Sequence, residues 1–435
     1  MNQNAPPKFK TASKPAPLSR DERKSLIKQV LIVFFGFLSV GLPLPPISLY
    51  IHDQLGFSAG VIGFAIGIQS VVTVLTRHRA GTLSDHHGAR YAIRLGLPLS
   101  ALAGLFYLLA ATLPLPAEGK LALLLTGRVA LGFGESLFIT GAMSWCIGRL
   151  GPHRTGLVMS WQGIAMYSAI GLGAPIGLAV YASIGFAGVG VLAAISPLIA
   201  LGIAYAIPDV PVSGSTERTP FYKVIGLIWR SGTVLFLATI PFAGITGFLA
   251  LTYVERGWSG AGIALAAFSS GFIFVRLVGS HLPDRFGGAR VAMASLAIEA
   301  LGQALIWLST SPMLALLGAL VTGIGFSLIF PSMGVEATRR VPIEQRGRAV
   351  ANFIAFFDLA IGLTAPAVGY AAGLFGYGTA FLIGAVAAIC ALVLAAQDDD
   401  NGEIRCNNDI GPSPTIDQAI NHGFPSRKIQ ATDTT

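Results

Sequence analysis

Long apolar stretches recur along almost the whole chain and are separated by short polar segments. A helix needs about 20 apolar residues to cross a bilayer, and twelve stretches are close to that length or longer. The apolar residues run continuously, whereas the strands of a membrane β-barrel would alternate with polar residues. The pattern therefore predicts twelve transmembrane helices, at about residues 28–51, 57–76, 91–113, 120–146, 156–182, 187–207, 232–254, 260–278, 291–310, 313–337, 348–374 and 378–397.

A polar segment rich in proline and serine lies midway along the chain and divides the predicted helices into two sets of six. The first apolar stretch is too long for a cleaved signal peptide, so we interpret it as a retained helix. The last segment begins with three consecutive aspartates, and we predict that it is disordered. We expect five parts: an N-terminal tail at 1–27, a six-helix bundle at 28–207, a connector at 208–231, a second six-helix bundle at 232–397 and a disordered C-terminal tail at 398–435.

The composition supports a membrane protein. Only 11% of the residues are charged and 53% are hydrophobic, whereas soluble proteins carry about 25% charged residues. So few charges could not cover a water-facing surface, which excludes a soluble enzyme and a disordered protein. The 53 glycines among 435 residues are typical of closely packed membrane helices. Three scattered cysteines exclude a disulfide scaffold.

The basic residues predict the orientation in the membrane. If the N-terminus lies in the cytoplasm, 26 of the 29 lysines and arginines fall on the cytoplasmic side, as the positive-inside rule requires. An even number of helices then places both termini in the cytoplasm. The same placement accounts for the net charge of +8 without a nucleic-acid partner.

The two halves share residues at fixed spacings. One set recurs 199 positions later: Arg77, Asp85 and Gly88 correspond to Arg276, Asp284 and Gly287. Another recurs 191 positions later: Gly132, Gly134, Ser136, Gly171 and Pro175 correspond to Gly323, Gly325, Ser327, Gly362 and Pro366. Parallel repeats of six helices are typical of one class of secondary transporter, whose substrate lies between the halves near the bilayer midplane.

A candidate functional loop follows the second predicted helix. It carries Gly81, Asp85, Gly88 and Arg90, with Arg77 at the end of the preceding helix. Arg77 and Asp85 suit the dipoles of the two helix ends, and the glycines permit a tight reversal. This pattern resembles the signature cytoplasmic loop of the major facilitator superfamily. The resemblance implies that the loop latches the two halves together in one state of the transport cycle.

The second half holds a less complete copy of this loop, from Arg276 through Asp284 and Gly287. Its nearest preceding glycine, Gly279, is one residue too far from Asp284 to match. We assign it the same latch role as the first copy. The alternative for both copies is that their positive charges only fix the topology.

The fourth predicted helix contains two charged residues, Arg128 and Glu135, which are seven positions apart. Two helical turns place them on one face, about 10 Å from each other. Charges within a membrane are costly and usually face a polar cavity or a partner. Glu135 can exchange a proton, and Arg128 can bias that exchange. The segment from Thr126 to Ser136 resembles the fourth-helix motif of the same superfamily, in which a buried arginine is linked to proton coupling. The alternative is a static ion pair or network that only holds helices together.

Two further carboxylates fall within predicted helices. Asp358 lies in the eleventh, ahead of Gly362 and Pro366, and is either a second proton-coupling residue or a structural tie. Glu299 lies midway along the ninth helix, which is peripheral in the superfamily. We expect Glu299 to be a neutral, hydrogen-bonded packing residue.

The fifth predicted helix carries a run of small residues around a proline. Gly171, Gly173, Pro175 and Gly177 loosely resemble the glycine–proline motif of proton-linked exporters. Close helix packing around a proline bend explains the same residues.

Signatures of several other protein classes are missing from the sequence. It contains no GxxxxGK[ST] phosphate-binding loop, no HExxH zinc motif and no GxSxG nucleophile elbow. We therefore expect no enzyme activity, no cofactor and no metal ion. A membrane-bound enzyme and a membrane sensor are the alternatives from other classes. The first lacks a catalytic constellation, and the second usually has a folded soluble domain.

The resemblance covers about residues 28–397 and points to an arabinose-efflux-like or drug–proton antiporter-like bacterial branch of the superfamily. It implies a secondary active transporter that works by alternating access. Our leading hypothesis is proton-coupled efflux of small organic molecules, and the alternative is a proton symporter that imports a sugar or an organic acid. We expect a monomer in the bacterial inner membrane. Its partners would be a small-molecule substrate, protons and the lipid bilayer.

Overall fold

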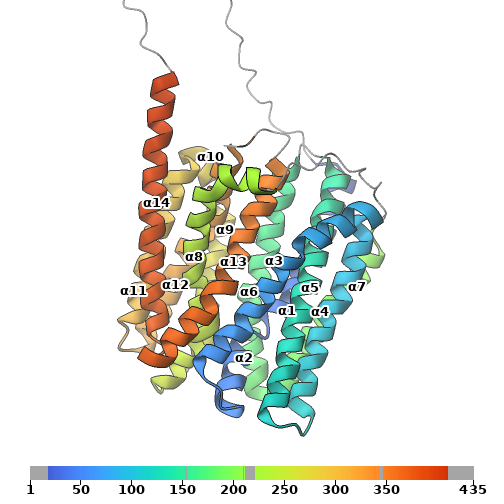
Figure 1. The fold of residues 1–435 in the computed structure, drawn as a ribbon, viewed down its shortest axis with the longest axis vertical. Coiled ribbons are helices and arrows are strands. Elements are labelled where there is room, and N and C mark those ends of the chain that lie inside the picture. Colours follow the sequence, from blue (N-terminus) through green and yellow to red (C-terminus); the bar gives the residue numbers. More distant parts are fainter. Residues whose placement is uncertain are drawn as a thin grey trace, which may run out of the picture.

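The computed structural model describes residues 18–151, 154–208, 210, 221–339, 341 and 346–409, and every regular element within these ranges is a helix. Twelve helical segments are long and apolar enough to cross a membrane. They run side by side in two groups, α1 to α7 in one half and α8 to α14 in the other (Figure 1). The predicted all-α membrane fold, with twelve helices in two six-helix bundles, is therefore confirmed.

The first half contains seven α-helices and one π-helix: α1 (Arg20–Gly41), α2 (Leu44–Leu49), η1 (Tyr50–Gln54), α3 (Ala59–His87), α4 (Ala89–Thr112), α5 (Ala117–Leu150), α6 (Thr155–Ile184) and α7 (Phe186–Tyr205). The second half contains α8 (Phe221–Glu255), α9 (Ala261–Gly279), α10 (Leu282–Phe286), α11 (Gly288–Trp307), α12 (Pro312–Arg339), α13 (Arg346–Phe375) and α14 (Thr379–Asp409). The elements α1, α2 and η1 together form the first span, because prolines between Gly41 and Ile47 interrupt regular helical hydrogen bonding.

Three helices extend into segments that we predicted to be tails or connector. Helix α1 begins within the predicted tail 1–27, α8 begins within the predicted connector 208–231, and α14 continues into the predicted disordered tail 398–435. The helices are longer than the spans drawn from hydropathy, because hydropathy marks the lipid-facing turns of a helix and not its polar ends. The rest of the predicted tails and connector, at 1–17, 209, 211–220 and 410–435, lies outside the described residues.

The start of α1 illustrates how a polar sequence continues a membrane helix. Ser19 and Glu22 form a capping box: the backbone N–H of Glu22 donates to Ser19 Oγ at 3.2 Å, and the backbone N–H of Ser19 donates to Glu22 Oε2 at 2.8 Å. Both bonds satisfy N–H groups that would otherwise lack partners at a helix N-terminus. Polar residues therefore set where α1 begins.

Large apolar side chains cover the outward surface of the molecule. Leu75, Ile184, Phe274 and Phe375 are 73%, 69%, 65% and 76% exposed. Exposed apolar surface on this scale marks contact with lipid or a partner. Together with the twelve long apolar helices, it identifies a multi-pass membrane protein.

Two helix pairs make the main contacts between the halves. Helix α3 packs along α13, and α6 packs on α9. Glycines bring α3 and α13 close together. A Cβ atom at Gly63 would overlap the carbonyl oxygen of Ala365, and one at Gly67 would lie 2.7 Å from the carbonyl oxygen of Gly362. The backbones of the two halves are therefore in direct contact at this interface.

This close contact predicts that Gly63→Ala destabilises the protein. The added methyl group forces α3 and α13 apart, and overpacking of this kind costs about 1–3 kcal/mol. We expect a lower midpoint of thermal unfolding for the purified protein. Gly60→Ala is the matched control, since a Cβ atom there has only Ser58 Oγ nearby, at 3.8 Å. Equal midpoints for the two variants would contradict the tight interface.

Candidate functional site

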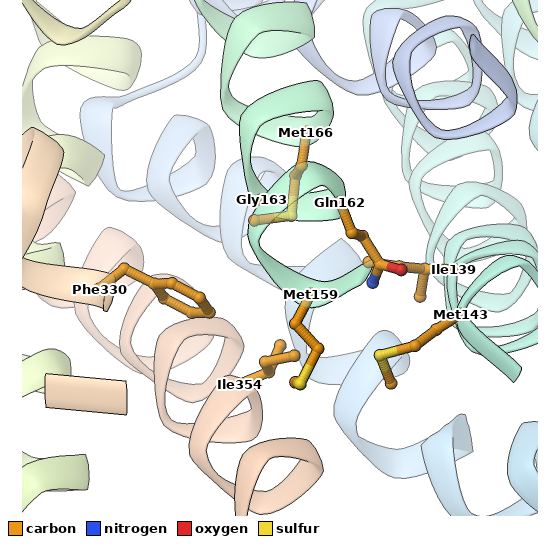
Figure 2. Close-up of a pocket in the computed structure, with 8 residues that line it drawn as sticks. All are labelled: Ile139, Met143, Met159, Gln162, Gly163, Met166, Phe330 and Ile354. Atoms are coloured by element: carbon orange, nitrogen blue, oxygen red, sulfur yellow. The ribbon is translucent and has the colours of Figure 1, made fainter. Parts of the chain in front are cut away.

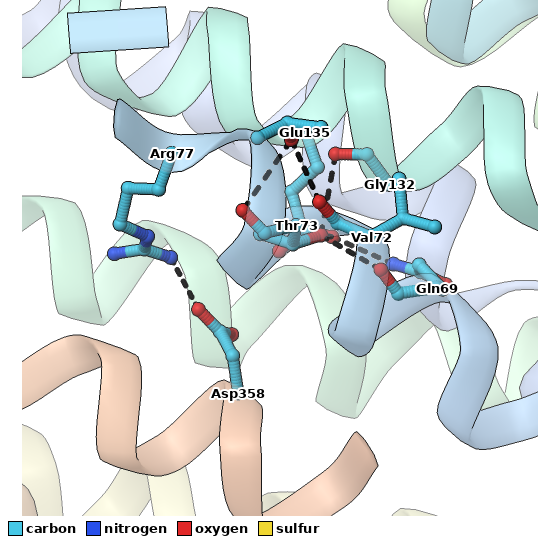
Figure 3. A network of polar contacts seen from close by, with 8 residues as sticks. Gln69, Val72, Thr73, Arg77, Gly132, Glu135 and Asp358 are labelled. Atoms are coloured by element: carbon cyan, nitrogen blue, oxygen red, sulfur yellow. Dashed lines mark hydrogen bonds and ion pairs between the residues drawn. The ribbon is translucent and has the colours of Figure 1, made fainter. Parts of the chain in front are cut away.

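One face of α3 carries three polar residues that point into the molecule. Gln69, Thr73 and Arg77 are spaced four residues apart, which places them on the same side of a helix. Figure 3 shows them along α3, with Glu135 of α5 above and Asp358 of α13 below in this view. The two carboxylates, one from each half, therefore contact the same face of α3.

Glu135 is buried, with 6% exposure, and is hydrogen-bonded to α3. Gln69 Nε2 donates to Glu135 Oε2 at 2.7 Å, and Thr73 Oγ1 lies 3.4 Å from the same oxygen (Figure 3). The Thr73 hydroxyl also lies 3.0 Å from the carbonyl oxygen of Gln69 and 3.2 Å from that of Gly132. The Thr73 hydroxyl has a single proton to donate. It can therefore turn this proton from Glu135 to a backbone carbonyl oxygen when the Glu135 carboxyl group changes its protonation state.

Asp358 is also buried, and its partner is Arg77. The Arg77 guanidinium donates from Nη2 to Asp358 Oδ2, which makes an ion pair between α3 and α13 (Figure 3). Their side chains are only 18% and 7% exposed. We predicted Arg77 to lie beside a cytoplasmic loop, but it lies within α3 and binds the opposite half. The ion pair joins the two halves of the protein.

The other predicted latch residues take different places. Helix α3 continues to His87, so Gly81 and Asp85 lie within the helix and Gly81 forms no turn. The reversal before Arg90 is made at Gly88, whose φ of 93° favours glycine. In the second half, Gly287 makes the equivalent turn, with a φ of 91°. The side chain of Asp284 lies outside the described part of the chain, and the latch role of both loops stays a prediction.

Arg128 is buried, as predicted, but its hydrogen bonds go to α3. Its Nε donates to the carbonyl oxygen of Ala65 and its Nη2 donates to that of Ile66, both at 2.8 Å. Among the described residues it forms no ion pair with Glu135. A direct Arg128–Glu135 pair is therefore wrong for this state, and Arg128 ties α5 to α3.

The small residues of α6 have packing contacts. A Cβ atom at Gly173 would lie 2.8 Å from the backbone nitrogen of Leu42, and one at Gly177 would overlap the carbonyl oxygen of the same residue. Gly171 accepts a hydrogen bond from Ser269 of α9. Pro175 lies within α6 and its counterpart Pro366 within α13, where Pro366 packs near Gly67. These contacts support the packing interpretation, and the link to export stays a prediction.

Glu299 of α11 is fully buried, but its environment differs from our expectation. Both of its carboxyl oxygens are buried and have no hydrogen-bond partner among the described residues. A Cβ atom at Gly325 would lie 2.7 Å from the Glu299 Cα atom, so α11 and α12 are close together here. Glu299 is therefore a packing residue, and the described residues give its carboxyl group no hydrogen bond.

An aromatic cluster lies between the halves and was missed in the sequence. The ring of Tyr167, on α6, lies within 5.0–6.4 Å of five rings from the second half, which are Phe242, Phe272, Phe326, Phe330 and Phe357. Aromatic residues within apolar helices carry no separate signal, so only the fold could reveal the cluster. The cluster joins α6 of the first half to α8, α9, α12 and α13 of the second half.

A small cavity adjoins the aromatic cluster. It has a volume of about 20 Å³ and is lined from the first half by Ile139, Met143, Met159, Gln162, Gly163 and Met166, and from the second half by Phe330 and Ile354 (Figure 2). This volume holds about one water molecule. The cavity is therefore too small for an organic molecule in this state.

In the described part of the chain no group of three or more His, Cys, Asp or Glu residues is placed to hold a metal ion. The charged groups buried in the site are the two carboxyl groups of Glu135 and Asp358 and the guanidinium groups of Arg128 and Arg276. Carboxyl groups can bind and release protons, and the arginines can respond to the resulting change of charge.

A model of a known protein family matches most of the chain. The model of the family described as "Major Facilitator Superfamily" matches residues 30–261 and 236–414. An uncharacterized MFS-type transporter of Salmonella typhimurium is 42% identical over 386 residues, which cover 88% of this chain and 97% of that protein. One from Pseudomonas aeruginosa strain UCBPP-PA14 is 40% identical over 390 residues, which cover 88% of this chain and 96% of that protein.

Solved structures of transporters share the fold. A bacterial homolog of the human lysosomal transporter Spinster, in an inward-facing and occupied conformation, has a TM-score of 0.71 and 13% identity and covers 88% of this chain and 98% of that one. A D-xylose–proton symporter has a TM-score of 0.70 and 15% identity, with 86% of this chain and 96% of that one covered. At these identities the likeness concerns the fold alone.

Proposed function

Because this chain belongs to the major facilitator superfamily and is a multi-pass membrane transporter, we propose that it is a proton-coupled secondary transporter. It would work by alternating access and export small organic molecules. Glu135 and Asp358 would be the residues that exchange protons. The proposal is carried by one observation: these two buried carboxyl groups come from opposite halves and meet the same face of α3.

Proton binding at Asp358 would act directly on the contact between the halves. A neutral Asp358 no longer compensates the charge of Arg77, and a buried charge without its partner is costly. The contact between α3 and α13 would therefore weaken when Asp358 takes up a proton. This links the protonation state to the separation of the halves.

Arg77 would connect the two carboxyl groups. It lies one turn beyond Thr73, which contacts Glu135, and its guanidinium is paired with Asp358. When Asp358 is neutral, Arg77 can turn towards Glu135 and favour the ionised form of that residue. A proton gained at one carboxyl group would then accompany a proton lost at the other.

The direction of transport is proposed from the resemblance of the Gly171–Gly177 segment to proton-linked exporters. Uptake of a sugar or an organic acid by proton symport is the alternative. The distribution of lysines and arginines supports cytoplasmic termini, and the bacterial relatives support the inner membrane of a bacterium. We propose that the transporter works as a monomer.

Flux measurements in vesicles test the proposal. We expect the purified protein, in vesicles with an imposed pH gradient, to move a substrate faster than without the gradient, and a protonophore to remove the difference. Substrates would come from a growth screen with toxic organic compounds. Flux that ignores the gradient would rule out proton coupling. Whole cells decide the direction, because an exporter lowers the internal substrate concentration and an importer raises it.

A further inference from the structure

The internal repeat relates the ion pair between the halves to a second pair of residues. Arg276 corresponds to Arg77 at the spacing of 199, and Tyr167 corresponds to Asp358 at the spacing of 191. The second pair also spans the halves, since Arg276 is on α9 and Tyr167 is on α6. The Arg276 Cζ atom lies 5.8 Å from the centre of the Tyr167 ring. The α3–α13 interface thus contains an ion pair, and the equivalent position of the α6–α9 interface contains an arginine beside a phenol.

Arg276 has no carboxylate partner among the residues whose side chains are described. It is 5% exposed, its Nη1 donates to the carbonyl oxygen of Ser327 at 2.9 Å, and its Nε is buried without a hydrogen-bond partner. The Tyr167 hydroxyl is also buried and has no hydrogen-bond partner in the described part of the chain. Buried charges in membrane proteins are normally paired. This interface therefore holds a guanidinium that has no carboxylate partner and a phenol that has no hydrogen-bond partner among the described residues.

These groups adjoin the cavity shown in Figure 2. A Cβ atom at Gly163, which lines the cavity, would lie 3.4 Å from Arg276 Nη2. The ring of Phe330, on the opposite wall, lies 6.0 Å from the ring of Tyr167. The absence of a side chain at Gly163 lets the guanidinium lie directly behind the cavity wall.

The cavity wall itself is mostly apolar. Three methionines line it, and its polar residue, Gln162, accepts a hydrogen bond from Gln29 at 3.0 Å. Methionine and phenylalanine side chains adapt to apolar groups of varied shape. The interface therefore offers an unpaired cation and a phenol next to an adaptable apolar surface.

We propose that Arg276 and Tyr167 bind the carboxylate of an organic anion, whose apolar part occupies the space lined by methionine and phenylalanine. This assignment rests on the proposed transport function and adds the class of substrate. Guanidinium groups bind carboxylates through paired, charge-assisted hydrogen bonds, and the phenol supplies a further donor. The halves separate to admit the anion and close around it.

At the α6–α9 interface, the bound carboxylate would occupy the position that is equivalent to that of Asp358 at the α3–α13 interface. The empty carrier has one paired and one unpaired arginine between its halves, and the loaded carrier has both paired. Closing around an empty site buries an uncompensated charge, whereas closing around the anion does not. The substrate therefore favours the closed state through Arg276.

Binding to the purified full-length protein tests the proposal without a pH gradient. The probes are phenylacetate, 4-phenylbutyrate and octanoate, each compared with its neutral amide by calorimetry at a pH where the acids are ionised. We expect at least one acid to bind about 10- to 100-fold more tightly than its amide, the range for hydrogen bonds to a charged group. Arg276→Gln should remove this preference, Arg276→Lys should keep part of it, and Tyr167→Phe should weaken binding of the acid.

Arg256→Gln is the matched control, because Arg256 also lies beside an aromatic ring, 5.0 Å from that of Trp258, and donates to the carbonyl oxygen of Ser309. It should keep the preference for the acid. The proposal is overturned if no acid binds more tightly than its amide to the natural protein, or if Arg276→Gln keeps the preference. Should Arg276→Gln fail to fold, the natural protein and Arg276→Lys decide. An acid preference without gradient-driven flux would instead refute proton coupling and leave this site standing.

Discussion

Glu135→Gln is expected to reduce gradient-driven transport to the level of vesicles without protein, while the variant still folds and inserts into the membrane. Glutamine has nearly the same shape as glutamate, and its side-chain oxygen can still accept the hydrogen bond from Gln69. It cannot bind or release a proton near neutral pH, so the coupled step is lost. The measurement is flux in vesicles with an imposed pH gradient, together with the amount of protein recovered from the membrane.

The matched control for this variant lies on the same helix. Glu118 is exposed and lies in the first turn of α5, so Glu118→Gln makes the same chemical change away from the interface. We expect it to transport at the natural rate. If Glu135→Gln keeps its dependence on the gradient, the proton-coupling residue is elsewhere, and Asp358 becomes the first alternative.

The twelve helices could be predicted from the sequence because lipid imposes a simple requirement. A segment in the bilayer core must satisfy all its backbone hydrogen bonds and present about 20 apolar residues. The ends of the helices have no such requirement. Helix α8 therefore begins at Phe221 and α14 ends at Asp409, in polar segments that hydropathy assigned to connector and tail.

The candidate site was predicted in part. Glu135, Arg128 and Asp358 stood out because charged residues are rare within membrane spans. Their partners depend on the rotation of each helix and on how the halves meet, which one sequence does not contain. Arg77 was placed at the end of its helix, beside a loop, because the apolar stretch ends at residue 76, whereas α3 continues to His87.

Uncharged partners were harder to find. Gln69 and Thr73 carry no charge and do not interrupt the apolar pattern, although both lie at helical spacing from Arg77. Tyr167 could have been found from the repeat, since it occupies the position of Asp358 at the spacing of 191. Its contact with Arg276 follows only from the packing of α6 on α9. Pseudo-symmetry therefore indicates which positions correspond, and the fold shows which residues meet.

The ion pair between Arg77 and Asp358 gives the second large expected effect, in a double-mutant comparison. Arg77→Gln leaves a buried carboxylate without its partner, and Asp358→Asn leaves a buried guanidinium. Removing one partner of a buried pair costs about 3–5 kcal/mol, whereas replacing both can be nearly neutral. We expect each single variant to unfold at a clearly lower temperature in detergent. The double variant should recover most of the lost stability.

Transport separates the structural role of this pair from its role in coupling. We expect no gradient-driven flux from either single variant or from the double variant, because glutamine and asparagine hold the interface without responding to protons. The pair Arg339–Glu336, at 3.4 Å, in which the arginine side chain is 68% exposed and the glutamate side chain 14%, is the control. An ion pair with a solvent-exposed partner contributes little to stability, so the corresponding neutral variants should unfold and transport like the natural protein. If the loss of stability in the double variant equals the sum of the losses in the two single variants, the two charges do not interact. Coupled transport by the double variant would exclude the pair from the proton cycle, and Glu135 would then have to act alone.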